Sequence, residues 1–540
     1  MRSALIIGSL AVAAAFTLGG IFLSTIFWWM LAVVAPLILI VLYDSFQNEH
    51  AILRNFPLLG RSRYAAEWLR PKLYQYFIES DTDGRPVSRI FRSIAYQRAK
   101  KVNDTTPFGT QLNVYSEGYE WMNHSIAPLD HHKVNHDPRV TVGGADCQKP
   151  YDLSMLNVSA MSYGSLSAHA IMALNGGAAI GSFAHNTGEG GISDHHRKFN
   201  GDLIYQIGTG YFGCRNKEGR FDADNFLKTI ADTNVKMIEL KLSQGAKPGH
   251  GGILPAKKVT PEIAKIRNVE MGQSVLSPPY HREFSTPVGL LEFLKKLRDL
   301  SGGLPVGFKL CMGHRGEFIA ICKAMITTGI KPDFITVDGS EGGTGAAPLE
   351  FANSVGTPYR EGLAVAYDTL IGFDLKKDIT LIAAGKIFTG FHMVRAIALG
   401  ADACYSARAM MMALGCIQAL ECNHNTCPVG VATTDKSLMK GLVVGDKKTR
   451  VANFHGETIK SFVELMAAAG IDHPDRINRS HVNRRIIMSK HMRYDEIYPY
   501  MTEGCLLSQD TCPDDWKSDL ASYTADSFQP RYEEVYIEED

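Results

Sequence analysis

The chain begins with a long apolar run, because residues 3–43 contain no Asp, Glu, Lys, Arg or His. As a single helix these residues would reach about 60 Å, twice the roughly 30 Å thickness of the hydrocarbon layer of a bilayer. The run therefore predicts two membrane-spanning helices, about 4–23 and 27–43, with a chain reversal between them. Trp28 and Trp29 would lie at the membrane interface, where aromatic side chains settle. We expect a transmembrane helical hairpin.

Basic residues flank this hairpin on both sides. Arg2 precedes it, and five more cations follow it within about thirty residues: Arg54, Arg61, Arg63, Arg70 and Lys72. By the positive-inside rule both ends lie on the cytoplasmic face, which predicts an inner-membrane protein whose body faces the cytoplasm. A cleaved secretory signal is the alternative, since Ala13, Ala14 and Ala15 resemble a cleavage region. The apolar run nevertheless continues well beyond a signal core of about 7–15 residues.

From about residue 151 onward, short apolar runs alternate with amphipathic segments. The clearest unit is a helix that begins at Thr286-Pro287, a cap followed by proline, and stops at Gly302-Gly303. At least six strands over about 250 residues predict an α/β fold, a closed (β/α)8 TIM barrel, with an open doubly wound sheet as the alternative. The predicted strands are 156–159, 238–242, 306–310, 334–337, 380–383 and 403–405, with further helices at 316–328 and 391–399.

These patterns divide the chain into four parts. Residues 1–44 are the two-helix transmembrane anchor, and 45–140 are a linker and an irregular lead-in layer. Residues 141–440 form the barrel. Residues 441–540 are a C-terminal helical extension, with a helical stretch near 456–469 that ends at Gly470.

Composition narrows the range of partners and the compartment. Lys plus Arg and Asp plus Glu number 56 each, so the chain lacks the basic excess that nucleic-acid binding requires. Of its ten cysteines, three fall within twelve residues, and the others are scattered as expected for reduced thiols. We therefore expect no nucleic-acid partner and a cytoplasmic body.

Glycine-rich turns follow the later strands. Residues 338–348 contain four glycines within seven positions, and the next two strands run into Gly385-Lys386 and Arg408. Such turns bring backbone N–H groups against an anion, and barrel enzymes often hold the phosphate of a flavin nucleotide or another phosphorylated ligand there. Tight turns without a ligand are the alternative interpretation.

Lys309 is a charge inside an otherwise apolar predicted strand, 306–310. A buried cation is costly unless it has a partner. It could stabilise the anionic reduced ring of a flavin, or it could simply pair with a nearby carboxylate.

Cys416, Cys422 and Cys427 form the compact cysteine group, and proline and glycine follow the last of them closely. This spacing suits a loop wrapped around an iron–sulfur cluster, and with three cysteines a three-iron cluster is the simplest occupant. His424 leaves a Cys3His zinc site as the alternative.

Six motifs, in order over about 140–440, resemble the FMN-binding synthase domain of glutamate synthase, and the spacing of the three cysteines also agrees. They are Ala160-Met-Ser-Tyr-Gly-Ser165, Asn186-Thr-Gly-Glu-Gly-Gly191, Gln206-Ile-Gly-Thr-Gly-Tyr-Phe-Gly213, Glu239-Leu-Lys-Leu-Ser-Gln-Gly-Ala-Lys-Pro-Gly249, 338–348 and Cys427-Pro-Val-Gly-Val-Ala-Thr433. The resemblance implies a (β/α)8 barrel that carries FMN and a 3Fe-4S cluster.

The resemblance also implies roles for individual residues. Lys247 and Arg267 would bind the carboxylates of 2-oxoglutarate, with Glu189 as a further catalytic residue. Cys416, Cys422 and Cys427 would hold the cluster. The flavin would contact Met161, Ser162 and Gln206, with Lys309 at its polar edge and Gly342, Gly343, Gly385 and Lys386 near its phosphate.

The sequence departs from the family pattern near the substrate. His250 and Ile253 stand where the family usually has an acidic residue and a glutamine, and Ile192 stands where it tends to be acidic. Neither a glutaminase with an amino-terminal cysteine nor a G-x-G-x-x-G fingerprint directly after one of the predicted strands is evident, so we expect ammonia and electrons from outside.

The implied activity is therefore a membrane-anchored oxidoreductase of glutamate synthase type, acting on 2-oxoglutarate or a related oxo acid. Its expected partners are membrane lipid and a separate electron donor or acceptor protein. The alternatives are an electron-transfer protein that links an amino or imino acid to a membrane quinone or redox partner, and a scaffold with vestigial cofactor sites.

Overall fold

The computed structural model describes residues 2–102, 105–231 and 233–531. The chain divides into two compact units, Met1–Arg89 and Ile90–Asp540. Each unit is described by itself below.

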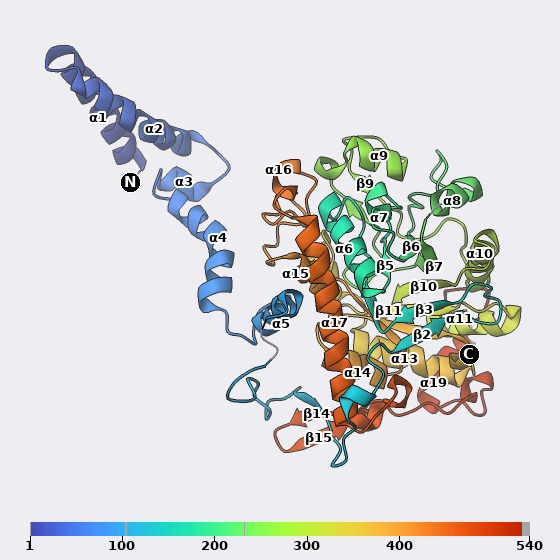
Figure 1. Ribbon diagram of the computed structural model, residues 1–540. Coiled ribbons are helices and arrows are strands. Elements are labelled where there is room, and N and C mark those ends of the chain that lie inside the picture. The colour runs from blue at the N-terminus through green and yellow to red at the C-terminus, as the bar shows by residue number, and fades with distance from the viewer. Residues whose placement is uncertain (1, 103–104, 232, 532–540) are drawn as a thin grey trace, which may run out of the picture. The chain divides into compact units, whose positions relative to one another are not determined.

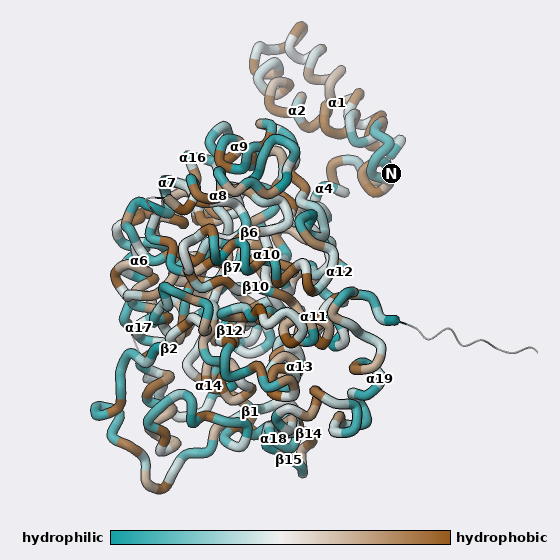
Figure 2. The backbone as a smooth tube through the Cα atoms, turned by 90° about the vertical axis from the view of Figure 1, so that its right-hand side faces the viewer, coloured by the Kyte–Doolittle hydropathy of each residue, from teal (hydrophilic) through white to brown (hydrophobic). Residues whose placement is uncertain are grey.

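The first unit contains the predicted helical hairpin. Helices α1 (Arg2–Phe22) and α2 (Ile26–Phe46) are joined by a three-residue reversal, and the rings of Phe16 and Phe27 lie 6.3 Å apart across it. Both helices are long and apolar enough to cross a membrane, and their hydrophobic stretches are visible in Figure 2. Only 6% of each apolar stretch is buried, so neither is a core helix of the described unit. The prediction of two apolar N-terminal helices is confirmed.

An ion pair connects α2 to the segment that follows. The carboxylate of Asp44, near the end of α2, is fully buried and lies 2.6 Å from the guanidinium of Arg61. Arg61 opens α4, so the pair fixes the start of that helix against the hairpin. The remaining elements of this unit are α3 (Ala51–Asn55), α4 (Arg61–Leu73) and a π-helical turn, Tyr74–Ile78.

The second unit contains a closed barrel of eight parallel strands, which confirms the predicted (β/α)8 fold (Figure 1). Around the barrel the order is β10, β11, β12, β13, β4, β5, β6 and β7, so sequential strands are neighbours throughout. The strands are β4 (Leu156–Val158), β5 (His185–Asn186), β6 (Leu203–Ile207), β7 (Val235–Lys241), β10 (Val306–Cys311), β11 (Phe334–Asp338), β12 (Thr380–Ala384) and β13 (Ala403–Ser406).

The predicted helix boundaries agree with local chemistry. The Thr286 hydroxyl caps α10 by accepting a hydrogen bond from the backbone N–H of Gly289 at 3.0 Å, and Gly329 ends α11 with a φ of +69°. The barrel helices are α6 (Ala168–Gly181), α7 (Asp194–Arg197), α8 (Ala223–Ile230), α9 (Pro261–Arg267), α10 (Pro287–Leu300), α11 (Arg315–Thr328), α12 (Leu349–Ser354), α13 (Tyr359–Gly372), α14 (Gly390–Ala398), α15 (Arg408–Leu414) and α16 (Lys436–Met439).

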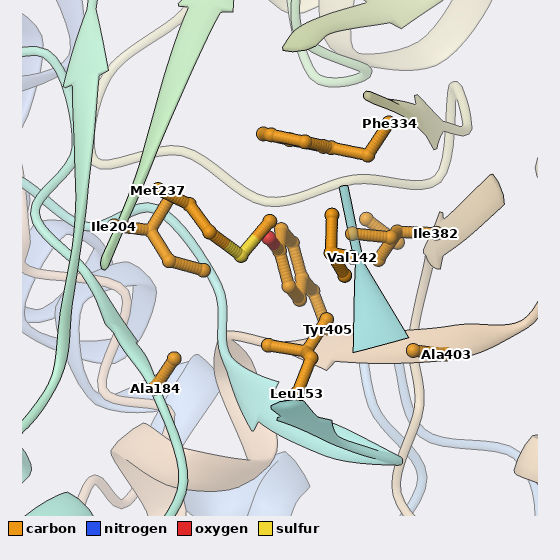
Figure 3. Packing of buried hydrophobic residues seen from close by; sticks show 10 residues of the cluster. Val142, Leu153, Ala184, Ile204, Met237, Phe334, Ile382, Ala403 and Tyr405 are labelled. Atoms are coloured by element: carbon orange, nitrogen blue, oxygen red, sulfur yellow. The ribbon is translucent and has the colours of Figure 1, made fainter. Parts of the chain in front are cut away.

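A two-stranded hairpin closes the amino-terminal end of the barrel. Its strands, β2 (Arg139–Val142) and β3 (Tyr151–Ser154), pair antiparallel, and Val142 and Leu153 pack into the barrel core (Figure 3). The Tyr151 hydroxyl donates to the carboxylate of Asp202, just before β6, at 2.7 Å. With this end closed, the carboxyl ends of the strands are left for ligands.

The lead-in and the extension differ from the prediction. Strand β1 (Glu120–Met122) pairs with β14 (Val482–Ile487), and β14 pairs with β15 (Lys490–Arg493). The lead-in is therefore not wholly irregular and the extension is not wholly helical. A three-residue strand and one with two adjacent arginines, Arg484 and Arg485, lack the alternation that would reveal strands in the sequence.

Helix α17 (Val444–Ala468) is longer than the predicted helical stretch. It packs against α6 and α14, beside which it lies in Figure 1. The other helices of this unit are α5 (Arg89–Lys100), α18 (Tyr494–Ile497) and α19 (Asp514–Ser522), with 3-10 turns at His131–Lys133, Ala256–Lys258, Lys376–Asp378, Pro474–Arg476, Arg479–His481 and Cys505–Leu507.

Arg479 connects the extension to the barrel. Its guanidinium is fully buried, lies 2.7 Å from the Asp368 carboxylate of α13, and donates to the carbonyls of Tyr498 and Pro499. Removing one partner of such a pair leaves a buried charge, so Arg479→Ala should destabilise the protein by about 3–5 kcal/mol. Urea denaturation of the detergent-solubilised protein would measure this loss. The exposed pair of Arg476 and Asp472 provides the control, because Arg476→Ala should cost no more than about 1 kcal/mol.

Candidate functional site

A fully buried carboxylate lies at the centre of the barrel. Glu239 of β7 accepts hydrogen bonds from Asn186 at 2.8 Å, Gln206 at 2.6 Å and Thr336 at 2.7 Å. These donors belong to β5, β6 and β11, and β11 is not a neighbour of β7. The network therefore crosses the barrel interior and fixes the amide of Gln206, a predicted flavin contact.

Lys309 lies on β10, two positions nearer the carboxyl end of that strand than Gly307, the residue paired with Glu239. Its ammonium is 3.1 Å from the carboxylate of Asp338, which also accepts from the backbone N–H groups of Gly245 and Gly339. Burial alone would lower the pKa of Lys309, but the carboxylates of Asp338 and Glu239 outweigh it and raise the pKa above its usual value. Lys309 is therefore a fixed cation at the barrel mouth, and it has the carboxylate partner that the alternative interpretation expected.

Glu189 lies among three cations. Its carboxylate is 2.9 Å from the ammonium of Lys241 at the end of β7. Burial raises the pKa of Glu189, but the charges of Lys241, Arg267 and Lys247 more than offset this and hold the pKa below its usual range. The three predicted substrate-site residues Glu189, Lys247 and Arg267 are thus brought together, and Lys241 joins them.

Arg267 at the end of α9 connects this charged group to the loop after β4. Its guanidinium donates to the carbonyl of Tyr163 at 3.0 Å and to the Ser162 hydroxyl at 3.4 Å, and it lies 5.0 Å from the ring centre of Phe212. Burial lowers the pKa of Arg267 to about 10, although the negative charge of Glu189 opposes this shift. Its buried Nε has no hydrogen-bond partner in the described structure. An unsatisfied buried donor of this kind suits an anionic ligand.

Lys247 is also buried, and its ammonium donates to the carbonyl of Ala346 at 2.9 Å. Ala346 belongs to the glycine-rich turn after β11, so Lys247 connects the substrate loop to that turn. Burial and the charge of Lys241 lower the pKa of Lys247 to about 8, although Glu189 opposes the shift. Lys247 therefore changes its charge within an experimentally accessible pH range.

The predicted phosphate turns approach one another closely. A Cβ added to Gly385 would come within 2.8 Å of the Tyr359 ring, and one added to Gly343 within 3.1 Å of the Arg408 side chain. The guanidinium of Arg408 donates to the carbonyl of Glu341, one residue before Gly342. Lys386 has a left-handed backbone with a φ of +49°. Glycines and a partly buried arginine thus line these turns, a composition that suits phosphate binding.

The loop after β4 and the loop after β5 lie in close contact with each other. A Cβ on Gly188 would lie 2.6 Å from the backbone nitrogen of Ser162 and 2.8 Å from the carbonyl carbon of Met161. Only glycine fits at this position. The predicted flavin contacts Met161 and Ser162 therefore lie against the loop that carries Glu189. The donors, the cations and the phosphate turns together fit a flavin mononucleotide at the barrel mouth.

Cys416, Cys422 and Cys427 have free thiols in one loop. In addition to the effect of burial, a negative charge on Cys427 would raise the pKa of both Cys416 and Cys422. Burial raises the pKa of Cys416 to about 11. In the described structure no three ligand atoms of these cysteines and His424 lie within 4.8 Å of one another. One zinc ion would hold its sulfur ligands about 3.8 Å apart, given Zn–S bonds of about 2.3 Å. In the described residues the thiols therefore do not lie at the spacing of a zinc site.

Two charged residues of β7 were given no role from the sequence. Glu239 and Lys241 are two positions apart and face the barrel interior, but neither was assigned a role although both lay in a recognised motif. The available signal was a charge within an apolar strand, the same signal that identified Lys309.

Comparisons with known proteins identify the family of this chain. A family model described as a conserved region in glutamate synthase matches residues 104–472. The chain belongs to the glutamate synthase family. It is therefore an enzyme, a glutamate synthase-like oxidoreductase, as predicted.

Individual relatives of the family cover different shares of the chain. The glutamate synthase large subunit-like protein YerD of Bacillus subtilis is 38% identical over 482 residues, which are 82% of this chain and 91% of that protein. An archaeal-type glutamate synthase (NADPH) of Thermotoga neapolitana is 34% identical over 316 residues, 58% of this chain and 59% of that protein. Among solved structures, the flavin-binding domain of baker's yeast flavocytochrome b2 aligns with a TM-score of 0.41 and 12% identity, covering 82% of this chain and 89% of that chain.

Proposed function

We propose that this protein is a membrane-anchored flavin and iron–sulfur oxidoreductase that reductively aminates 2-oxoglutarate to glutamate, using ammonia and electrons supplied from outside. The observation that carries the proposal is the group of Lys241, Lys247, Arg267 and Glu189 at the barrel mouth.

The net charge of this group matches the substrate. Three cations and one carboxylate leave two positive charges, and 2-oxoglutarate is a dianion. The guanidinium of Arg267 offers a bidentate fork to one carboxylate, and the ammonium of Lys247 offers a point charge to the other. An ionised Glu189 would accept a hydrogen bond from a protonated imine nitrogen and thereby orient it.

FMN would occupy the mouth beside this group. Met161, Ser162 and Gln206 would contact its ring, Lys309 would stabilise its polar edge, and Gly342, Gly343, Gly385 and Lys386 would surround its phosphate. When bound, the flavin would supply the hydride that reduces the imine. Gln206 and Lys309 are held in place by Glu239 and Asp338, so the chain orients the ring before substrate arrives.

Cys416, Cys422 and Cys427 would hold a 3Fe-4S cluster. Three free thiols in one loop support this assignment. The cluster would pass electrons from an external donor toward the flavin.

The two apolar helices would anchor the protein in the inner membrane through contacts with lipid. Arg2 and the cations after α2 favour a cytoplasmic location for both ends of the hairpin, and hence for the catalytic body. A glutamate synthase barrel needs no membrane for its chemistry, so the anchor points to a separate electron donor or acceptor protein there.

The same helices favour a second candidate function. Because they are exposed and long enough to cross a bilayer, the protein could exchange electrons between an amino or imino acid and a membrane quinone or redox partner.

One experiment separates the two functions. The detergent-purified protein would be reduced without oxygen, and oxo acids with ammonia, or a quinone analogue, would then be added. We expect 2-oxoglutarate with ammonia to restore the oxidised flavin absorbance fastest and to yield glutamate. Reoxidation by the quinone alone would favour the second function. Protein purified without flavin would exclude both.

A further inference from the structure

Lys258 is a buried amine at the junction of three segments. It closes the 3-10 turn Ala256–Lys258, in the segment between β7 and β10 that also carries Arg267, and only 3% of the residue is exposed. Its ammonium donates to the carbonyl of Ser165 at 3.2 Å and to the carbonyl of Ala432 at 3.0 Å. Three parts of the chain that are distant in sequence therefore meet at this one nitrogen.

The two carbonyls belong to the loops proposed for the two cofactors. Ser165 lies in the loop after β4, close to Met161 and Ser162, and Ala432 follows Cys427 in the cysteine loop. A second contact joins the same loops, because the backbone N–H of Ser167 donates to the carbonyl of Val431 at 2.9 Å. Lys258 thus reinforces a direct junction between the flavin loop and the cysteine loop.

The charge of Lys258 lacks a carboxylate partner. No carboxylate lies within 4.0 Å of its ammonium in the part of the chain that the structure describes. Burial lowers the pKa of Lys258, and the two groups that oppose this shift are the thiols of Cys422 and Cys427. An uncompensated buried cation is costly, so this position fits a cation that is neutralised by an anionic occupant of the cysteine loop.

We propose that Lys258 is a positioning residue for electron entry, which compensates the negative charge of the thiolate-bound cluster and fixes the cysteine loop to the flavin loop. This inference rests on the proposed function, since it requires the cluster. Reduction adds one electron, taken from the external donor, to the cluster, and the ammonium keeps its proton throughout. Because a nearby cation stabilises the more negative reduced cluster, Lys258 raises the reduction potential of the cluster.

Three variants test this role. Lys258→Met removes the charge but keeps the length of the side chain, Lys258→Arg keeps the charge, and Lys257→Met is the matched control because Lys257 is exposed. The measurements are the iron content per chain and a redox titration of the paramagnetic resonance signal of the oxidised cluster. We expect the equilibrium constant for cluster reduction to fall about tenfold in Lys258→Met, which corresponds to about 59 mV for one electron. Lys258→Arg and Lys257→Met should keep the wild-type potential.

Each other outcome is also informative. Loss of iron in Lys258→Met but not in Lys258→Arg would support charge compensation, because the cluster would then need the cation to assemble. An unchanged potential in Lys258→Met, or equal loss of iron in the Met and Arg variants, would overturn the inference alone. Wild-type protein without iron would overturn both the inference and the proposed cluster.

Discussion

Cys422→Ser should remove the iron from the protein while leaving the flavin and the fold in place. Cys422 is the middle one of three thiols in the cysteine loop, and three thiolates are the minimum donor set for a 3Fe-4S cluster. A serine hydroxyl is a poor substitute because it does not ionise near neutral pH. Iron content should fall to near zero, the resonance signal of the oxidised cluster should vanish, and the flavin absorbance should persist. Turnover with the native electron donor should fall about 100-fold or more.

Cys147→Ser is the matched control for this substitution. Cys147 is another partly buried free thiol, and its Sγ lies 3.4 Å from the carbonyl of Gly303, a contact that serine can retain. It is distant in sequence from the cysteine loop, so its replacement should leave the iron content unchanged. An unchanged iron content in Cys422→Ser as well would exclude the ligand assignment.

The barrel could be predicted from the sequence because most of its strands and helices carry strong local signals. The threonine cap and the terminal glycines delimit α10, and six of the eight barrel strands are visible as apolar runs. The two that were missed have physical reasons. β5 is only two residues long, His185–Asn186, and β6 is a five-residue run, Leu203–Ile207, whose one polar residue, Gln206, points to the interior network. Strands as short as these are stabilised by their neighbours rather than by their own pattern.

The sheet formed by β1, β14 and β15 could not be predicted. Its strands come from opposite ends of the second unit, and Glu120 on β1 contacts Arg360 and Arg395 on two barrel helices. Contacts between such distant positions are set by the complete fold and leave no periodicity in the sequence.

The candidate site shows the same division between local and long-range signals. Lys309 could be identified as a charge in an apolar strand, and the same rule would have identified Glu239 and Lys241 on β7. Lys258 is different, because its importance comes from carbonyls at positions 165 and 432. Only the folded chain brings these groups together.

Lys247→Ala should weaken the binding of 2-oxoglutarate by about 10-fold or more, the value of a lost charge-assisted contact. The pH dependence of binding gives a sharper test. Burial and Lys241 lower the pKa of Lys247 to about 8, so its ammonium loses its proton as the pH rises through that value. The substrate remains a dianion over this range. The affinity of the wild-type protein should therefore be constant below about pH 8 and should fall above it.

Direct titration of the oxidised protein with 2-oxoglutarate, followed by the change in the flavin spectrum, measures this affinity without the ammonia that turnover requires. Ammonia would confound a rate measurement, because its own protonation also changes with pH. The fall above about pH 8 should disappear in Lys247→Ala, whose affinity is already low at neutral pH. Lys265→Ala removes an exposed cation from α9, the helix that carries Arg267, and should keep both the wild-type affinity and the wild-type pH profile. If the pH-dependent loss persisted in Lys247→Ala, the titrating group would be another residue, and the assignment of Lys247 to the substrate carboxylate would be wrong.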